Sequence, residues 1–185
     1  MSALTQIPEL KEQDEYFMGL AIQQAQKAQD VGEVPIGAII VAPKHPLEMS
    51  KSDDGVDVEV TGVESEFGDV VGSGFNQPIR ENDPSAHAEV VAIRMACRQM
   101  NNYRLPGATL YVTVEPCVMC AGAIIHSRIS RCVYGAQETK AGSIGHLDIF
   151  NQPWLNHKVA VHGGVCGDQC SKLMSHFFAN IRESK

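Results

Sequence analysis

The stretch Glu115-Pro116-Cys117-Val118-Met119-Cys120 places two cysteines three residues apart, directly after a β-branched and aromatic run at 108–114. This run predicts a buried strand that ends at Glu115, and Pro116 is expected to open a helix as its first residue. Both thiols then lie in the first helical turn and on one face, where unpaired amides and the helix dipole favour thiolates. Two such thiolates suit a soft metal ion such as zinc.

A second motif, Asp83-Pro84-Ser85-Ala86-His87-Ala88-Glu89, also predicts a helix start, with Asp83 as the cap and Pro84 at the first helical position. His87 can add a nitrogen ligand to the two thiolates and leave a fourth position for water, as in catalytic zinc sites. Glu89 is expected to hold the proton taken from that water, without binding the metal. The two motifs together match the H-x-E…P-C-x-x-C pattern of zinc nucleobase deaminases.

The bulk properties are those of an ordinary globular protein. At 185 residues, with 44% hydrophobic and 20% charged residues, the chain is expected to form one domain, 1–185. The polar N-terminus resembles no signal peptide, and no apolar run reaches membrane-spanning length. Six cysteines without an export signal favour reduced thiols and a cytoplasmic location.

The charge is unevenly distributed along the chain. The net charge is −7, but residues 71–185 carry eleven basic and eight acidic residues. The half that holds both motifs is therefore mildly basic, which permits a polyanionic substrate. The acidic stretch 43–69 is expected to be a solvated insertion at the tip of a hairpin, with room for a frayed hairpin through 56–60.

Hydrophobic periodicity predicts strands that alternate with helices. Strands are expected at 35–41, 70–75, 108–114, 130–134 and 158–161, and helices at 14–30, after each motif and at 165–182. The alternation predicts an α/β fold, a three-layer α/β/α sandwich with a central mixed five-stranded sheet whose first pair is antiparallel. A glycine-containing loop at 135–154 is expected to line the site. Cys166 and Cys170 are interpreted as buried or incidental thiols.

Beyond the two motifs, the chain resembles the bacterial tRNA-specific adenosine deaminases of the cytidine-deaminase superfamily, over nearly its whole length except 43–69. The resemblance rests on five segments: Glu33–Ala38, Gly74–Pro78, Asp83–Glu89, Asn102–Leu105 and Thr109–Ile129. It implies a cytidine-deaminase-like fold, a homodimer with one Zn²⁺ per subunit, and deamination of the wobble adenosine in a tRNA anticodon stem-loop to inosine. An anticodon loop offers the unstacked base that attack at C6 requires.

The same resemblance implies a role for each site residue. The zinc ligands would be His87, Cys117 and Cys120, and Glu89 would be the catalytic proton shuttle. The residues that bind the substrate would be Asn76 and the backbone amide of Ala88, which hold the base, and Glu33, Val34 and Pro35, which wall the pocket.

One departure from the family pattern follows Gly135-Ala136, where the family has Arg-Asp and this chain has Gln137-Glu138. Glu138 keeps a carboxylate for a neighbouring ribose hydroxyl, on a longer side chain. Gln137 lacks a charge that can contact phosphate. The departure is expected to affect the affinity and fine specificity for the substrate. The metal-binding and catalytic residues match the family pattern.

Two other functions remain open. The protein can be a free-base or nucleotide deaminase that acts on guanine or cytosine, although the long match around Cys117 counts against this. It can also be a zinc-stabilised RNA-binding module without turnover. Glu89 counts against the module, because a structural zinc site closes its fourth position with a further ligand.

Overall fold

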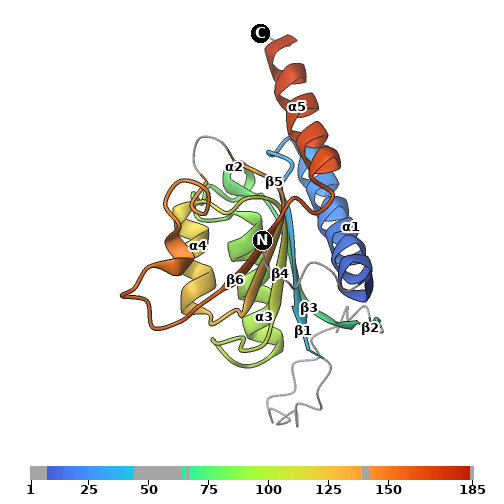
Figure 1. Cartoon of the computed structure of the whole chain (residues 1–185). Coiled ribbons are helices and arrows are strands. Elements are labelled where there is room, and N and C mark those ends of the chain that lie inside the picture. The colour runs from blue at the N-terminus through green and yellow to red at the C-terminus, as the bar shows by residue number, and fades with distance from the viewer. Residues whose placement is uncertain (1–7, 44–63, 66, 139–141, 184–185) are drawn as a thin grey trace, which may run out of the picture.

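A mixed sheet with the strand order β2-β3-β1-β4-β5-β6 forms the centre of the computed structural model (Figure 1), which describes residues 8–43, 64–65, 67–138 and 142–183. The strands are β1 (Gly37–Ala42), β2 (Glu64–Ser65), β3 (Gly68–Phe75), β4 (Thr109–Val114), β5 (Arg131–Ala136) and β6 (Ala160–Gly163). β1 runs antiparallel to both β3 and β4, whereas β4, β5 and β6 are parallel. The five expected strands and the mixed sheet are confirmed, and β2 adds two residues beside β3.

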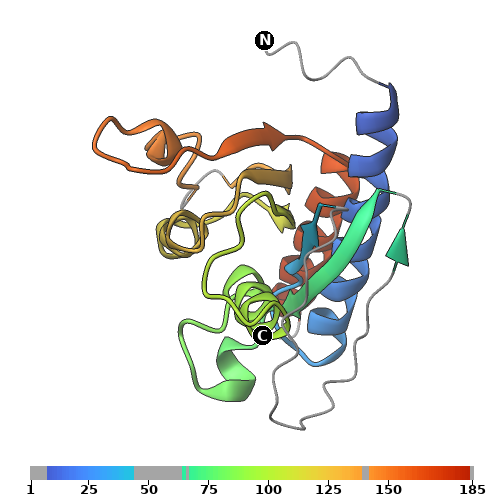
Figure 2. The ribbon, with the colours of Figure 1, turned by 90° about the horizontal axis from the view of Figure 1, so that it is seen from below.

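Helices cover both faces of the sheet (Figures 1 and 2). The long helices α1 (Pro8–Asp30) and α5 (Gly167–Glu183) lie on one face, and α3 (Ala88–Gln99) and α4 (Val118–His126) lie on the other. Two short elements, α2 (Pro78–Glu81) and the 3₁₀ turn η2 (Ile149–Asn151), lie in the connections. The expected α/β/α sandwich is therefore confirmed. In the part of the chain that the structure describes, no helix is long and apolar enough to cross a membrane.

The two faces of the sheet carry separate hydrophobic cores. Successive side chains of a strand point to opposite faces, so Ile39 packs with α1 residues and Ile40 packs with α3 and α4 residues. In the same way, Leu110 packs in the core beneath α3 and α4, and Tyr111 packs in the core beneath α1. Because both faces are covered, the strands are apolar at consecutive positions, and this explains why continuous apolar runs located them correctly.

The α3 helix lies directly on β3 because β3 contains glycines where the two backbones meet. A Cβ atom on Gly72 would lie 2.4 Å from the carbonyl oxygen of Ala92, and one on Gly74 would lie 2.6 Å from that of Ala88. Both distances are too short for a side chain. The two glycines therefore set the position of α3, and with it the position of His87 at its start.

A buried ion pair joins α1 to the sheet. Arg131 donates to both carboxylate oxygens of Asp14, at 2.7 and 2.6 Å, and the hydroxyl of Tyr111 donates to Asp14 at 3.0 Å. Burial, with the nearby Asp14 carboxylate, raises the pKa of Tyr111. Both oxygens of the Asp14 carboxylate have hydrogen-bond donors, so the carboxylate holds α1 against the sheet. It lies on the face of the sheet away from α3 and α4.

Both motif helices begin later than the sequence predicted. Pro84 does not start a helix, since Asp83 accepts from the amide and hydroxyl of Ser85 in a tight turn, at 2.8 and 2.7 Å. α3 begins at Ala88 with His87 as its N-cap, and α4 begins at Val118 with Cys117 as its N-cap. Both N-cap residues have extended backbones, with ψ of 151° and 173°. The expected first positions at Pro84 and Pro116 are therefore wrong.

Three other boundaries also differ. The first helix starts at Pro8 instead of Asp14, and the last starts at Gly167, so Cys166 lies before it with a φ of 51°. β6 begins at Ala160, two residues later than expected. The expected hairpin at 56–60 lies outside the described residues.

Candidate active site

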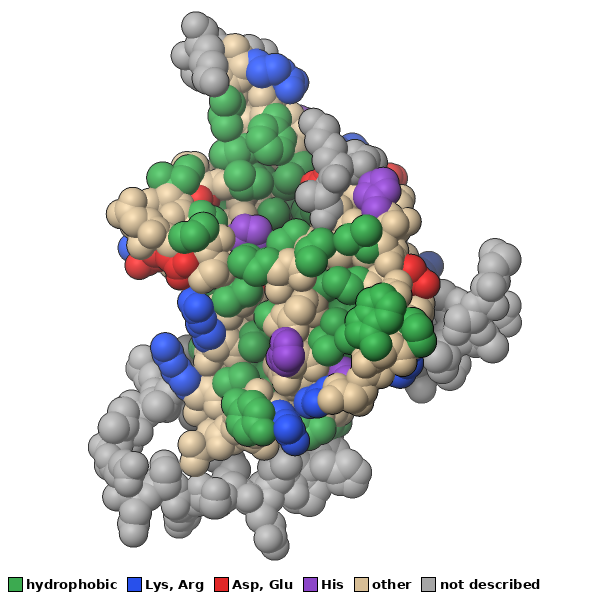
Figure 3. Space-filling view, turned by 90° about the vertical axis from the view of Figure 1, so that its left-hand side faces the viewer, with side chains coloured by type: hydrophobic (Ala, Val, Ile, Leu, Met, Phe, Trp, Pro, Cys, Tyr) green, Lys and Arg blue, Asp and Glu red, His purple; other side chains and the backbone are tan. Residues whose placement is uncertain are grey.

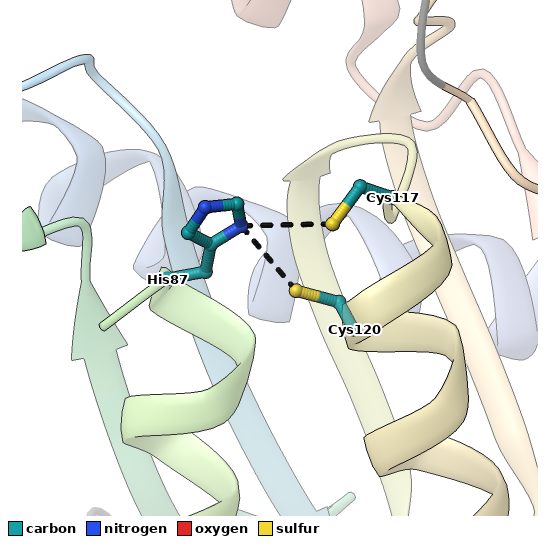
Figure 4. A group of neighbouring side chains, drawn as sticks. All are labelled: His87, Cys117 and Cys120. Atoms are coloured by element: carbon teal, nitrogen blue, oxygen red, sulfur yellow. Dashed lines mark hydrogen bonds between the residues drawn. The ribbon is translucent and has the colours of Figure 1, made fainter. Parts of the chain in front are cut away.

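Three side chains from the starts of α3 and α4 converge on one point (Figure 4). The Nδ1 atom of His87 lies 3.7 Å from Sγ of Cys117 and 3.5 Å from Sγ of Cys120. All three ligand atoms lie within 4.8 Å of one another. His87 and Cys117 are 30 residues apart in the chain. The structure thus brings the two motifs together, as the sequence predicted. We call these three residues the His-Cys-Cys cluster.

The electrostatics of the cluster are those of a site made for a cation. A hydrogen bond from Cys120, supported by His87, lowers the pKa of Cys117 to about 4. A hydrogen bond with Cys117 raises the pKa of His87. A separate hydrogen bond with Cys117, together with burial, raises the pKa of Cys120. A divalent cation at this point would favour the deprotonated thiols and the neutral imidazole that bind it.

The distances within the cluster fit a zinc ion. With Zn–N near 2.0 Å and Zn–S near 2.3 Å, a nitrogen and a sulfur on one tetrahedral zinc lie about 3.6 Å apart. The two observed nitrogen–sulfur distances are 3.7 and 3.5 Å. One imidazole and two thiolates also form a donor set that zinc prefers. Three protein donors leave one position open.

Glu89 is a buried carboxyl group beside the cluster. It is the second residue of α3, is 4% exposed, and lies close enough to Cys120 and His87 to interact with both. Burial raises the pKa of Glu89. Among the described residues, the group of convergent ligand atoms contains no carboxylate. The geometry therefore separates Glu89 from the three ligand candidates.

The residues expected to hold the base lie next to the cluster. Asn76 follows β3 and is buried, and its Oδ1 accepts from the amide of Ala88 at 2.9 Å. The Ala88 amide that we expected to contact the base thus donates to Asn76 in this structure. Since an N–H donor faces Oδ1, the orientation of the side-chain amide is fixed and its NH₂ group is turned away from Ala88.

The expected pocket wall lies at the same end of the sheet. Glu33, Val34 and Pro35 precede β1, and the amide of Asn76 donates to the carbonyl of Ile36 at 3.1 Å, which joins the two segments. Glu33 is buried, and its carboxylate accepts from the amide of Arg80 in α2 at 2.8 Å. In this structure Glu33 therefore fixes α2 beside the site.

The role of Glu115 was not predicted. Its carboxylate accepts from three backbone amides of the loop after β5: Glu138 at 3.1 Å, Ile144 at 2.8 Å and Gly145 at 2.8 Å. The sequence predicted a loop at the site, but a carboxylate that binds distant backbone amides has no pattern of its own. The glycines at 142 and 145 were the available signal for a loop at the site.

The expectation for Cys170 is confirmed, because Cys170 is a buried thiol packed against Gly135.

The fold and the site define the chain as a deaminase, and its sequence supports this class. The profile of the MafB19-like deaminase family matches residues 11–182. The tRNA-specific adenosine deaminase of Haemophilus influenzae is 41% identical over 173 residues, which cover 93% of this chain and 87% of the relative. That of Bacillus subtilis is 37% identical over 174 residues, covering 94% and 93%.

A solved structure of a tRNA:A34 deaminase, studied for A-to-I editing at the wobble position, is also similar. It superposes with a TM-score of 0.69 at 38% identity, over 85% of this chain and 98% of the other. The protein described here therefore belongs to the family of tRNA-specific adenosine deaminases.

Proposed function

We propose that this protein hydrolytically deaminates the wobble adenosine of a tRNA anticodon to inosine, with one zinc ion per subunit. The observation that carries the proposal is a buried carboxyl group, Glu89, set beside the His-Cys-Cys cluster at the starts of α3 and α4. The family membership and the similar tRNA:A34 deaminase support the choice of a tRNA substrate.

His87, Cys117 and Cys120 would hold the zinc ion. When bound, zinc would supply the Lewis acidity that lowers the pKa of a water molecule towards neutrality. Both N-cap positions, at His87 and Cys117, direct their side chains off the helix ends. This placement lets residues of two helices serve one ion, while the first turn of α3 brings Glu89 to its side.

Glu89 moves the protons of the reaction. Its carboxylate takes a proton from the attacking water and delivers it to N1 of adenine as the water oxygen bonds to C6. It then takes the proton of the new C6 hydroxyl group and passes it to the 6-amino group, and the C6–N bond breaks to release ammonia and leave the C6 carbonyl of inosine. Because Glu89 is buried, bulk water does not compete for these protons.

The flipped-out base would be bound by five residues beside the cluster: Asn76, Ala88, Glu33, Val34 and Pro35. The NH₂ group of Asn76 is the donor that its side chain can offer, since Oδ1 already accepts from Ala88. Glu138, half-buried in the loop after β5, would accept from the ribose hydroxyl of a neighbouring nucleotide.

We further propose that the protein is a homodimer of single-domain subunits that acts on tRNA in the cytoplasm. The outer side of α4 is apolar and open: Val118 and Met119 are exposed, and a Cβ atom on Gly122 would meet no other atom within 4 Å. Figure 3 shows apolar side chains gathered on this side of the molecule. A glycine inside a helix costs about 1 kcal/mol relative to alanine, and close approach of a second copy of this face would offset that cost.

A substrate comparison tests the proposed function. The zinc-loaded protein is incubated with a tRNA that carries a wobble adenosine, and separately with guanine, cytosine and cytidine, and released ammonia is measured. Ammonia from the tRNA alone is expected. Ammonia from guanine or cytosine alone would support a free-base deaminase, and tRNA binding without ammonia would support a binding module.

A further inference from the structure

Glu115 directly follows β4, and both of its carboxylate oxygens accept hydrogen bonds from backbone amides. Oε1 accepts from Ile144 and Gly145, both at 2.8 Å, and Oε2 accepts from Glu138 at 3.1 Å. The side chain is 3% exposed. A single buried side chain thus binds both described ends of one loop, which we define as residues 137–138 and 142–145 and call the Glu115 loop.

The residues that follow Glu115 bind the same loop. The amide and the hydroxyl of Ser143 both donate to the carbonyl of Pro116, at 3.1 and 2.7 Å. Cys117 forms an isolated antiparallel bridge with Gly142. The segment that delivers Cys117 to the cluster therefore also carries the Glu115 loop.

The loop is fitted closely around the carboxylate. A Cβ atom on Gly142 would lie 2.6 Å from Oε1 of Glu115, so a side chain at this position would displace the carboxylate. Gly145 packs against the side-chain nitrogen of Gln137, 2.9 Å from its ideal Cβ position. The loop backbone is thus built around Glu115, which holds the backbone amide of Glu138, and the side chain of Gln137 lies against Gly145.

We propose that Glu115 is a positioning residue for substrate recognition: its carboxylate fixes the Glu115 loop, so that Gln137 and Glu138 face the nucleotides beside the reacting adenosine. This inference rests on the proposed function for the identity of the substrate. The contacts that order the loop lie within the protein and do not involve the substrate. Loss of the carboxylate should therefore weaken tRNA binding while the chemistry at the cluster continues.

Glu115→Gln is the sharpest substitution, because it preserves the shape of the side chain. A glutamine oxygen can accept from Ile144 and Gly145, but its NH₂ group faces the Glu138 amide as a second donor. One end of the loop is then released and the other is retained. Hydrogen exchange of the backbone amides reports this change without any substrate, and zinc content, KM and kcat for an anticodon stem-loop are measured on the same protein.

The expected result is faster exchange centred on Glu138, with residues 142–145 affected less because the glutamine oxygen still accepts from Ile144 and Gly145. KM is expected to rise about tenfold, with kcat changed less than about threefold and zinc content unchanged. Unchanged exchange in the loop would overturn the proposal, as would faster exchange spread over the whole molecule. A loss of kcat at constant KM would overturn it too, because the carboxylate would then act on the chemical step.

Asp14→Asn is the matched control, since Asp14 is a buried, fully partnered carboxylate on the opposite face of the sheet. It is expected to accelerate exchange around α1 and to leave the loop and KM unchanged. If Glu115→Gln does not fold, Ser143→Ala replaces it, since it removes only the hydroxyl bond to Pro116. Exchange at 142–145 should then rise and KM should increase about threefold, and no change in either would overturn the proposal.

The two proposals can fail separately. If the unmodified protein releases no ammonia from any tRNA, the proposed function fails, while the exchange measurement still decides whether Glu115 orders the loop. If the tRNA is deaminated but Glu115→Gln leaves both KM and loop exchange unchanged, only the positioning role fails.

Discussion

The two residues that differ most in proposed role, His87 and Glu89, are separated by a single residue at the start of α3. His87 is the extended N-cap and points off the end of the helix towards the thiols, whereas Glu89 is within the first turn and buried. The change from extended to helical backbone between them explains how two side chains so close in sequence can serve different atoms of one reaction.

A division of labour follows from this placement. Glu89→Ala is expected to lower the rate of deamination by about 100-fold or more, while zinc content and folding stay near those of the unmodified protein. Cys117→Ala is expected to lose zinc as well, because it removes one of three protein donors. Metal analysis and circular dichroism of the two variants separate these outcomes. A Glu89→Ala protein that is also empty of zinc would overturn the assignment.

At the scale of single elements, α3 is placed by the glycines of β3. Gly74→Ala would set a methyl group against the carbonyl oxygen of Ala88, which must push the start of α3 away from the sheet. We expect the free energy of unfolding to fall by about 1–3 kcal/mol and zinc affinity to fall with it, because His87 moves with Ala88. Denaturant unfolding and zinc titration measure both quantities.

The matched control is Gly19→Ala, in α1, where an added Cβ atom would meet no other atom within 4 Å. It should raise helix stability slightly and leave zinc affinity unchanged. Full zinc affinity in a destabilised Gly74→Ala protein would show that α3 does not set the position of His87.

The sequence was sufficient for the strands but not for the helix starts. β1 has no polar side chain and β4 is buried at every position after Thr109, because both faces are covered, so their runs are visible without a structure. Pro84 and Pro116 resemble first helical residues, yet each precedes an extended N-cap residue that directs a ligand candidate away from the helix. The preference of proline for the first turn was outweighed by this local geometry.

The candidate site was predictable to a similar extent. Two short motifs indicated the His-Cys-Cys cluster and Glu89, because the chemistry requires those residue types at fixed spacing. The contacts of Glu33 with Arg80 and of Glu115 with its loop were not predictable. In both, a buried carboxylate binds backbone amides, and amides occur at almost every residue whatever its side chain.

The hairpin of β1 and β3 places the two ends of the acidic insertion far from the site. Ala42 pairs with Asp69 at one end, where the insertion begins, and Gly37 pairs with Phe75 at the other, beside Asn76. Five residue steps at about 3.3 Å each separate these two pairs by about 17 Å, and charges at that distance are screened over a Debye length of about 8 Å. Replacement of residues 43–68 by Asn-Gly is therefore expected to leave kcat/KM for tRNA within about threefold.

Steady-state kinetics on the shortened protein checks this expectation, with zinc content and thermal unfolding as controls for its integrity. A more than tenfold loss in a folded, zinc-replete protein would show that the insertion reaches the substrate or a second subunit.

At the scale of the whole molecule, a net charge of −7 does not favour RNA binding, but the mildly basic part that follows residue 70 does. If that part contacts phosphates, the affinity for an anticodon stem-loop should fall with salt, with a log–log slope of about 0.7–0.9 per phosphate contact. Binding by the Glu89→Ala protein across a salt series measures the slope without turnover. Affinity that is independent of salt would indicate a small-molecule substrate.

The central claim is that the cluster and Glu89 act on one adenosine of a tRNA. Sequencing of total tRNA, before and after treatment with the zinc-loaded protein, tests it most directly, because inosine and adenosine are distinguished at every position. We predict conversion of adenosine to inosine at the wobble position of the anticodon and no conversion by the Glu89→Ala protein. Inosine at other positions, or none at all with a zinc-replete protein, would contradict the account.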